Sequence, residues 1–282
     1  MERIKPFRLI FKSECNLEDA EIKRNVEKSL KYPRLRCAAP QSLPPMALVG
    51  GGPSAKASLD ILRSWEGDIY GINDQAGWLS DNGIGCYMYA IDGTEVLYKT
   101  GSLVKGAILA SRAHRNNYDQ FDFDKIQVFD VEEDGEDGIL GGGSAACRAA
   151  HLFTRMGYSQ IHYFGIDGCI ENVDETHVSG FQKVAQSNLI VVRAGDTDYL
   201  TNAVWYIQTI FLSEILPLYK NNLINRSAGL LKGMIDYPDT WHVAAISYQT
   251  FDSIKEGHKY EIFGIPYTRE YFDVGKIYRA KP

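Results

Sequence analysis

The sequence has few cysteines, no excess of positive charge and no long uninterrupted apolar run, and each of these absences excludes a class of protein. The five cysteines of this 282-residue chain are widely spaced and form no Cys-x-x-Cys pair. This argues against a cysteine-based zinc site and favours a reducing, cytoplasmic setting. The net charge of −6 offers no basic field to a nucleic-acid backbone, so we expect no nucleic-acid partner. The longest apolar stretch, residues 203–219, contains Gln208 and Glu214. We expect it to form a buried helix and no membrane span.

From Met46 onward, short apolar segments alternate with helical ones. Runs that are apolar throughout and separated by helices are typical of a parallel sheet covered on both faces. We therefore predict an α/β fold, a Rossmann-like, doubly wound and mostly parallel sheet. The expected strands are residues 47–50, 68–73, 86–92, 106–111, 125–131, 160–167 and 189–193.

The composition changes at both ends of this region. Residues 1–45 form an N-terminal appendage and linker, with a strand-like run at 7–11, a helix from Asn16 to about Lys31, and four prolines at 33–45. We expect residues 46–235 to form the Rossmann-like domain. Residues 236–282 are aromatic and β-prone. We expect them to form a small β-rich C-terminal extension, which is a candidate surface for a homo-oligomer.

The stretch ALVGGGPSAK, residues 47–56, follows the first strand of this domain and opens its first helix. Ligands of open α/β sheets bind at such strand-to-helix junctions, where free N–H groups and the helix dipole favour an anion. We predict that this loop holds the phosphates of a nucleoside phosphate; the alternative is a tight turn without a ligand. The residues assigned to this site are Gly50, Gly51, Gly52, Pro53 and Ser54.

The same loop also satisfies the dinucleotide pattern G-x-G-x-x-A, with Gly50, Gly52 and Ala55. Asp74 lies near the end of the second strand, where an acid that binds the ribose is expected. An NAD-dependent oxidoreductase is therefore a minor alternative.

A second glycine-rich loop, GILGGGSAACRAA at 138–150, repeats the arrangement. We assign Gly142, Gly143 and Ser144 to the same ligand, because two such helix starts suit an extended phosphate or phosphate–sugar group. The alternative is that these small residues only allow the helix to pack closely on the sheet.

Polar side chains follow three of the expected strands. Asn73 and Asp74 end one strand, Asp92 ends the next, and Asp167 ends a later one. We assign Asn73 and Asp74 to the same nucleotide-binding site as the glycine loops. Carboxylates at this edge could hold Mg²⁺ on phosphates or bind sugar hydroxyls, so we assign Asp92 and Asp167 as candidate metal ligands. Asp167 is also a candidate catalytic residue.

An acidic, irregular loop at 168–181 leaves the same edge and contains His177. A histidine beside a nucleotide crevice is a candidate general base or acid, and the alternative is a solvated surface side chain.

These motifs, from GGGPS through GIN and AID to GGGSAACRAAHLFTRMGYSQIHYFGID and THVSG, carry a family resemblance. Over residues 46–235 the chain resembles the Rossmann-like family of archaeal 6-hydroxymethylpterin diphosphokinases and their bacterial relatives. The same motif order resembles bacterial lipooligosaccharide sialyltransferases, whose loops hold a cytidine nucleotide and whose later histidine serves as base. That resemblance implies the base role for His177. The matching positions are Gly50, Gly52, Pro53, Ser54, Asn73, Gly143, Ser144, Gly165 and Asp167.

Residues and resemblance together favour a nucleotide-dependent transferase. Two chemistries remain open: diphosphate transfer to a pterin-like alcohol, and glycosyl transfer from a sugar nucleotide. The expected ligand is ATP or a cytidine or sugar nucleotide, Mg²⁺ is a candidate second cofactor, and the acceptor is undefined. A protein of a different class, a non-catalytic nucleotide-binding module in a larger assembly, is the alternative.

Overall fold

The structure is a computed structural model of the chain. It describes residues 2–4, 17–35, 42–131, 138–139, 144–170, 189–219, 222–238, 241–246, 260–262 and 265–267. The predicted strand at 7–11 lies outside these residues.

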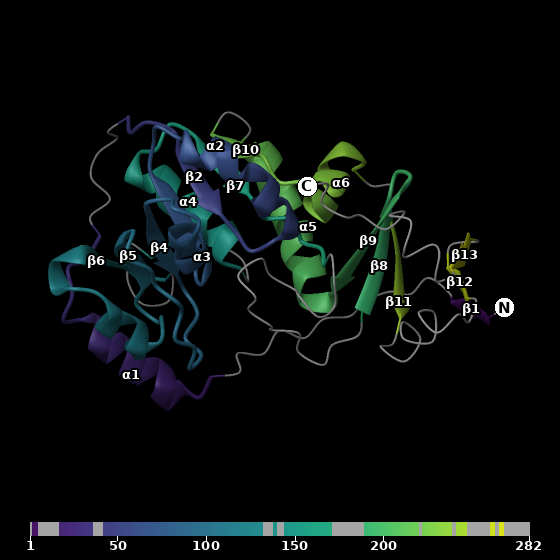
Figure 1. The fold of residues 1–282 in the computed structure, drawn as a ribbon. Coiled ribbons are helices and arrows are strands. Elements are labelled where there is room, and N and C mark those ends of the chain that lie inside the picture. Colours follow the sequence, from purple (N-terminus) through teal and green to yellow (C-terminus); the bar gives the residue numbers. More distant parts are fainter. Residues whose placement is uncertain are drawn as a thin grey trace.

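A seven-stranded sheet forms the centre of the fold (Figure 1). The strand order is β10-β7-β2-β3-β4-β5-β6, and every neighbouring pair is parallel. This confirms the predicted Rossmann-like α/β fold. The strands are β2 (Met46–Val49), β3 (Ile69–Ile72), β4 (Cys86–Ala90), β5 (Val104–Ala110), β6 (Ile126–Phe129), β7 (Ile161–Phe164) and β10 (Leu223–Asn225).

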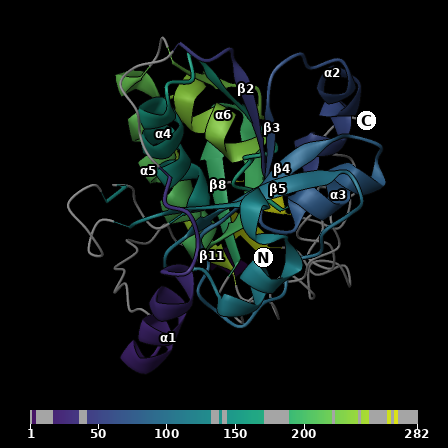
Figure 2. The same ribbon diagram turned by 90° about the vertical axis from the view of Figure 1, so that its left-hand side faces the viewer.

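Helices cover both faces of this sheet, as the apolar strands require. Figure 2 shows α2 and α3 on one side of the strands and α4 and α5 on the other. The central strands β2 and β7 are buried along their whole length, because they have neighbours on both edges and helices on both faces. The helices are α1 (Asp19–Ser29), α2 (Leu59–Arg63), α3 (Gln75–Asp81), α4 (Ala145–Met156), α5 (Ala203–Leu218) and α6 (Gly229–Asp236), with the 3-10 helices η1 (Pro53–Ser58), η2 (Arg115–Gln120) and η3 (Phe123–Lys125).

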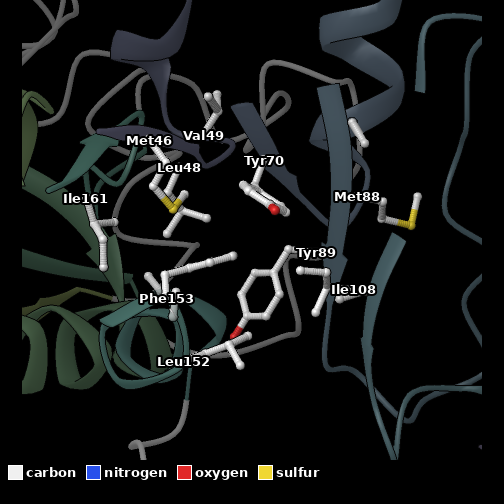
Figure 3. Close-up of a cluster of buried hydrophobic side chains, with 14 of the residues drawn as sticks. Met46, Leu48, Val49, Tyr70, Met88, Tyr89, Ile108, Leu152, Phe153 and Ile161 are labelled. Atoms are coloured by element: carbon white, nitrogen blue, oxygen red, sulfur yellow. The ribbon is translucent and has the colours of Figure 1, made fainter. Parts of the chain in front are cut away.

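Aromatic side chains dominate the contact between α4 and the sheet (Figure 3). Phe153 of α4 lies with its ring centroid 4.6 Å from that of Tyr70 and 5.4 Å from that of Tyr89. The Tyr89 hydroxyl donates to the carbonyl of Ala145, and the Tyr163 hydroxyl donates to the carbonyl of Ala146. These bonds fix the first turn of α4 above the ends of the strands.

Two small sheets lie apart from the parallel one. An antiparallel sheet has the order β11-β8-β9, and a second sheet has the order β1-β12-β13. The prediction that 189–193 belongs to the parallel sheet is therefore wrong, because this segment is the central strand of the antiparallel sheet. The seventh parallel strand is β10. The strands of the small sheets are β8 (Leu189–Ala194), β9 (Thr197–Asn202), β11 (His242–Ile246), β1 (Glu2–Ile4), β12 (Tyr260–Ile262) and β13 (Ile265–Tyr267).

Helix α1 from the N-terminal appendage packs on loops that follow β4 and β5. Asn25 is fully buried, and its Nδ2 donates to the carbonyls of Gly93 and Arg112, at 3.2 and 3.3 Å. Its Oδ1 accepts from the N–H of Arg115 at 3.2 Å. One side chain therefore links α1 to two loops at the carboxyl edge of the sheet.

Within the described residues, none of the helices is both long enough and apolar enough to cross a membrane.

Candidate functional site

The switch point of the sheet lies between β2 and β7. From β2 the chain builds the sheet in one direction, through β3 to β6, whereas β7 and β10 lie on the other side. Val49 pairs with Phe164, so the loops that leave these two strands begin side by side. This is the place where open α/β sheets bind ligands.

The first glycine loop packs against the end of β7 through its own backbone. The N–H of Gly50 donates to the carbonyl of Phe164 at 2.8 Å, and the N–H of Gly52 donates to the carbonyl of Gly165 at 2.7 Å. A Cβ on Gly52 would lie 2.5 Å from Oδ2 of Asp167 and 2.7 Å from the Gly165 carbonyl oxygen. The close approach that requires glycine at position 52 is therefore made within the protein.

The carboxylate of Asp167 lies against the first turn of η1, which follows this loop. Its Oδ2 accepts from the N–H of Ser54 at 2.7 Å, and its Oδ1 accepts from the Ser54 hydroxyl at 2.5 Å. The side chain is 1% exposed. The carboxylate thus accepts the hydrogen bonds that we predicted for a ligand phosphate. Hydrogen bonds to a charged acceptor are stronger than those between neutral groups.

Residues 226–231, to which we assigned no site role from the sequence, cover the same region. The N–H of Ala228 donates to Oγ of Ser54 at 3.3 Å, and the N–H of Leu231 donates to the backbone carbonyl of Asp167 at 3.0 Å. Ser227 accepts from the N–H of Ile166 at 2.8 Å. The chain between β10 and α6 therefore covers the end of β7, and the three-residue strand β10 that leads into it was not among the expected strands.

Asn73, at the carboxyl end of β3, has an unusual backbone and an unused polar atom. Its φ of +53° is the sole positive φ of a non-glycine residue in the described part of the chain. Its N–H donates to the carbonyl of Tyr89 at 2.8 Å. Its Oδ1 is buried and has no hydrogen-bond partner among the described residues. A buried acceptor without a donor is costly, so Asn73 is a candidate ligand contact at the edge of the sheet.

Asp74 and Asp92 stabilise the loop between β4 and β5. Oδ1 of Asp74 accepts from the N–H of Lys99 at 3.0 Å. Oδ1 of Asp92 accepts from the N–H and the hydroxyl of Thr94, at 2.9 and 2.8 Å. Burial, together with the nearby Asp92 carboxylate, raises the pKa of Tyr98. Both carboxylates therefore hold the loop in place, whatever else they bind.

The predicted metal ligands do not form part of a larger acidic group. No cluster of three or more His, Cys, Asp or Glu side chains suited to a metal ion occurs among the residues that the structure describes. Both Asp167 oxygens already accept from Ser54. A metal at Asp167 would have to share or replace these contacts, so the assignment of Asp92 and Asp167 to a metal stays a prediction.

At the second glycine loop, Ser144 is the N-cap of α4. Its Oγ accepts from the N–H of Cys147 at 3.1 Å, and the Arg148 guanidinium donates to the carbonyl of Ile139. Gly142, Gly143 and His177 lie outside the described residues, so their predicted roles stay predictions.

Comparison with known proteins supports the fold. No family model matches the chain, and no curated protein matches it. Among solved structures, the MAf glycosyltransferase from Magnetospirillum magneticum AMB-1 is similar, with a TM-score of 0.53 and 14% identity over 83% of this chain and 43% of that one. The chain thus spans less than half the length of that protein. The sialyltransferase CST-II, in complex with a trisaccharide acceptor and CMP, gives a TM-score of 0.34 and 13% identity over 75% of this chain and 99% of that one. At such identities, what the MAf likeness establishes is a shared α/β fold.

Proposed function

We propose that the protein transfers a glycosyl group from a nucleotide-activated sugar, with the nucleotide bound at the carboxyl edge of the parallel sheet beside Asn73. The shared fold with the MAf glycosyltransferase supports this class of activity. The motif resemblance to sialyltransferases at Gly50, Ser54 and Asn73 supports the same class.

The observation that carries the proposal is the state of Asn73. A left-handed backbone costs most non-glycine residues about 1–2 kcal/mol and asparagine less, and a buried acceptor without a donor costs about 1–3 kcal/mol. The structure keeps both features in a single residue at the end of β3. A ligand hydroxyl or amine that donates to Oδ1 would remove the second cost. Ribose hydroxyls and the amino group of cytosine or adenine are donors of this kind.

Glycosyl transfer fits the described carboxylates better than diphosphate transfer does. Diphosphate transfer needs Mg²⁺ held on the phosphates by acidic side chains. Asp167 instead binds Ser54, and Asp92 binds Thr94. A sugar nucleotide needs donors for its phosphates and an acceptor for its base or ribose, and Asn73 supplies the acceptor.

Substitution of Asn73 tests the proposal. Asn73→Gly removes the carboxamide and keeps the backbone, because glycine adopts a positive φ without strain. Isothermal titration with CMP, UDP, GDP and their sugar nucleotides should give a Kd about 5- to 100-fold higher for this variant than for the parent, equivalent to about 1–3 kcal/mol. Asn116→Ala is the matched control, because Asn116 is an exposed asparagine on η2, and this variant should bind as the parent does.

Turnover assays, together with the same titrations, separate the proposed activity from the other candidate functions. Release of free nucleoside phosphate from one sugar nucleotide, with transfer to a sugar acceptor, is the expected activity. Formation of AMP from ATP with a pterin-like alcohol would establish the diphosphokinase instead. Binding of NAD alone would favour the oxidoreductase, and nucleotide binding without turnover of any donor would favour the non-catalytic module. Equal nucleotide affinity in Asn73→Gly and the parent would contradict the role of Asn73.

A further inference from the structure

Helix α1 buries polar side chains in place of apolar ones. Its two buried residues, Asn25 and Ser29, are both polar, whereas the apolar Ile22 and Val26 are half-buried. In Figures 1 and 2 the helix lies apart from the helices that cover the faces of the parallel sheet. A helix that buries little apolar surface gains little hydrophobic free energy when it docks, so the polar contacts of α1 decide whether it stays in place.

Two ionic contacts join α1 to the segment that follows β5. The carboxylate of Glu21 accepts from the guanidinium of Arg115, and Nε2 of the buried His114 lies 3.6 Å from the same carboxylate oxygen. Lys28 pairs with Asp119 of η2. The side chains of Glu21 and Arg115 are 19% and 37% exposed. Dissolved salt screens charges that are open to solvent, so both contacts should weaken as the salt concentration rises.

Asn25 makes the contact that reports whether α1 is docked. The backbone N–H of Arg115 donates to Oδ1 of Asn25 at 3.2 Å, so this amide has its acceptor on α1. The carbonyls of Gly93 and Arg112 accept from Nδ2 of the same side chain. When α1 leaves, the Arg115 N–H loses its acceptor and can exchange its proton with water. Hydrogen exchange at Arg115 therefore measures the docking of a helix that lies far away in the sequence.

The chain directly after α1 is tied to the parallel sheet by backbone hydrogen bonds. The N–H of Leu35 donates to the carbonyl of Val128 at 2.7 Å, and the N–H of Val128 donates to the carbonyl of Pro33 at 2.9 Å. These bonds extend the edge of the sheet beside β6 and do not depend on the side chains of α1. The helix therefore has a fixed end at residues 33–35 and, on the helix itself, a polar latch, defined as Glu21 and Asn25.

We propose that α1 is a detachable strap across the loops that follow β4 and β5 at the carboxyl edge of the parallel sheet. In the docked state the polar latch holds both loops. In the undocked state α1 moves away about residues 30–32 while the sheet stays folded. The loop after β4 adjoins the candidate site, because the N–H of Asn73 donates to the carbonyl of Tyr89 near the end of β4. The strap thus controls the order of a loop beside that site. The proposal does not rest on the proposed function.

Hydrogen exchange of the ligand-free protein, followed residue by residue by NMR, distinguishes local undocking from global unfolding. The amides of α1 and the N–H of Arg115 should exchange at least about 10-fold faster than the amides of β2 and β7. The helix has 11 residues, and a helix of that length is marginal in water once it leaves the protein. Raising NaCl from about 20 mM to about 500 mM should speed exchange in α1 and at Arg115, and should not speed it in β2 and β7.

The Glu21→Gln variant tests the polar latch. Loss of the charge should speed exchange in α1 and at the Arg115 N–H by about 2- to 5-fold and should reduce the effect of salt, with β2 and β7 unchanged. Glu27→Gln is the matched control, because Glu27 is an exposed glutamate of the same helix whose carboxylate lies 4.0 Å from Lys23, also on α1. This variant should exchange as the parent does, since its charge makes no contact across to the loops.

Three outcomes would overturn the proposal. One is exchange of α1 and Arg115 at the rate of β2 and β7, which would mean that α1 leaves only when the whole protein unfolds. The second is fast exchange in α1 with a protected Arg115 N–H, which would mean that the helix frays in place. The third is equal exchange of α1 in Glu21→Gln and the parent at both salt concentrations, which would mean that Glu21 does not hold the helix.

Discussion

Replacing Asp167 by Asn would show whether this carboxylate serves the protein or a ligand. The substitution keeps the shape of the side chain and removes its charge. The carboxylate accepts two hydrogen bonds from Ser54, at 2.7 and 2.5 Å, and it is 1% exposed. Hydrogen bonds to a charged group contribute about 1.5–3 kcal/mol each, and an amide retains a single acceptor oxygen. We therefore expect Asp167→Asn to lose about 1.5–3 kcal/mol of unfolding free energy with no ligand present.

Thermal unfolding followed by circular dichroism measures this loss. In a domain of this size 1 kcal/mol corresponds to about 2–4 °C, so the Tm should fall by about 3–12 °C. Asp124→Asn is the control, because Asp124 is an exposed aspartate on η3, and its Tm should equal that of the parent. Ser54→Ala should cause a similar loss, and the double variant should lose clearly less than the sum, because both changes remove the same contact.

Unfolding of ligand-free Asp167→Asn at the parent temperature would contradict a structural role for this carboxylate. If such a variant also bound nucleotide or Mg²⁺ more weakly, the carboxylate would act on the ligand, as the sequence first suggested. Strict additivity of the two single variants would likewise refute a shared contact.

Three further changes test the described geometry. Gly52→Ala should lower the Tm strongly, because its Cβ would lie 2.5 Å from Oδ2 of Asp167. Gly85→Ala should lower the Tm much less, since its nearest neighbour, at 3.2 Å, is the end of a flexible lysine. Asn25→Ala should cost about 2–4 kcal/mol and speed hydrogen exchange in residues 92–94 and 112–115, because three hydrogen bonds of a fully buried side chain are lost. Burial lowers the pKa of His162 below its usual 6.5, so the unfolded chain binds that proton more tightly than the folded one. Stability should therefore fall as the pH drops from about 6.5 toward the folded pKa, and His162→Gln should flatten this part of the pH profile.

Each of these has a clear contrary result. Equal Tm values for the two glycine variants would mean that the loop does not pack tightly on β7. Unchanged exchange in both loops after Asn25→Ala would mean that α1 does not hold them. An identical slope of stability against pH in the His162→Gln variant would assign the acid sensitivity to another group.

The strands of the parallel sheet could be predicted because they are buried on both faces. A strand such as β2 or β7 must then be apolar at every position, and short runs of this kind are visible between polar helices. Residues 189–193 have the same appearance for the same reason, since β8 lies between β9 and β11 and is nearly all buried. An apolar run indicates that a strand is buried, but it does not indicate whether the neighbouring strands are parallel or antiparallel. The sheet to which residues 189–193 belong could therefore not be predicted. β10 has three residues, too few for any pattern.

The glycine loop is a more instructive case, because its place in the topology was predicted and its contacts were not. Glycine permits close approach of a backbone to anything, whether a phosphate or another strand. Gly52 approaches Asp167, and Ser54 binds the same carboxylate. Sequence distance hides this pairing, since 113 residues separate Ser54 from Asp167.

The Asp167 carboxylate limits where the phosphates of a nucleotide could bind at this edge of the sheet. Asp167 already supplies the negative charge at the turn after β2, so a phosphate at the same donors would meet like charge at short range. The N–H groups of Gly50, Gly52 and Ser54 are engaged inside the protein. Donors for the phosphates must then come from elsewhere, and α4 begins at the same edge, next to Ser144. A nucleotide that spans from Asn73 to the start of α4 would avoid Asp167 and still use the edge of the sheet. On this argument Asn73→Gly should weaken nucleotide binding without loss of stability, whereas Asp167→Asn should lower stability first and affinity only as a consequence.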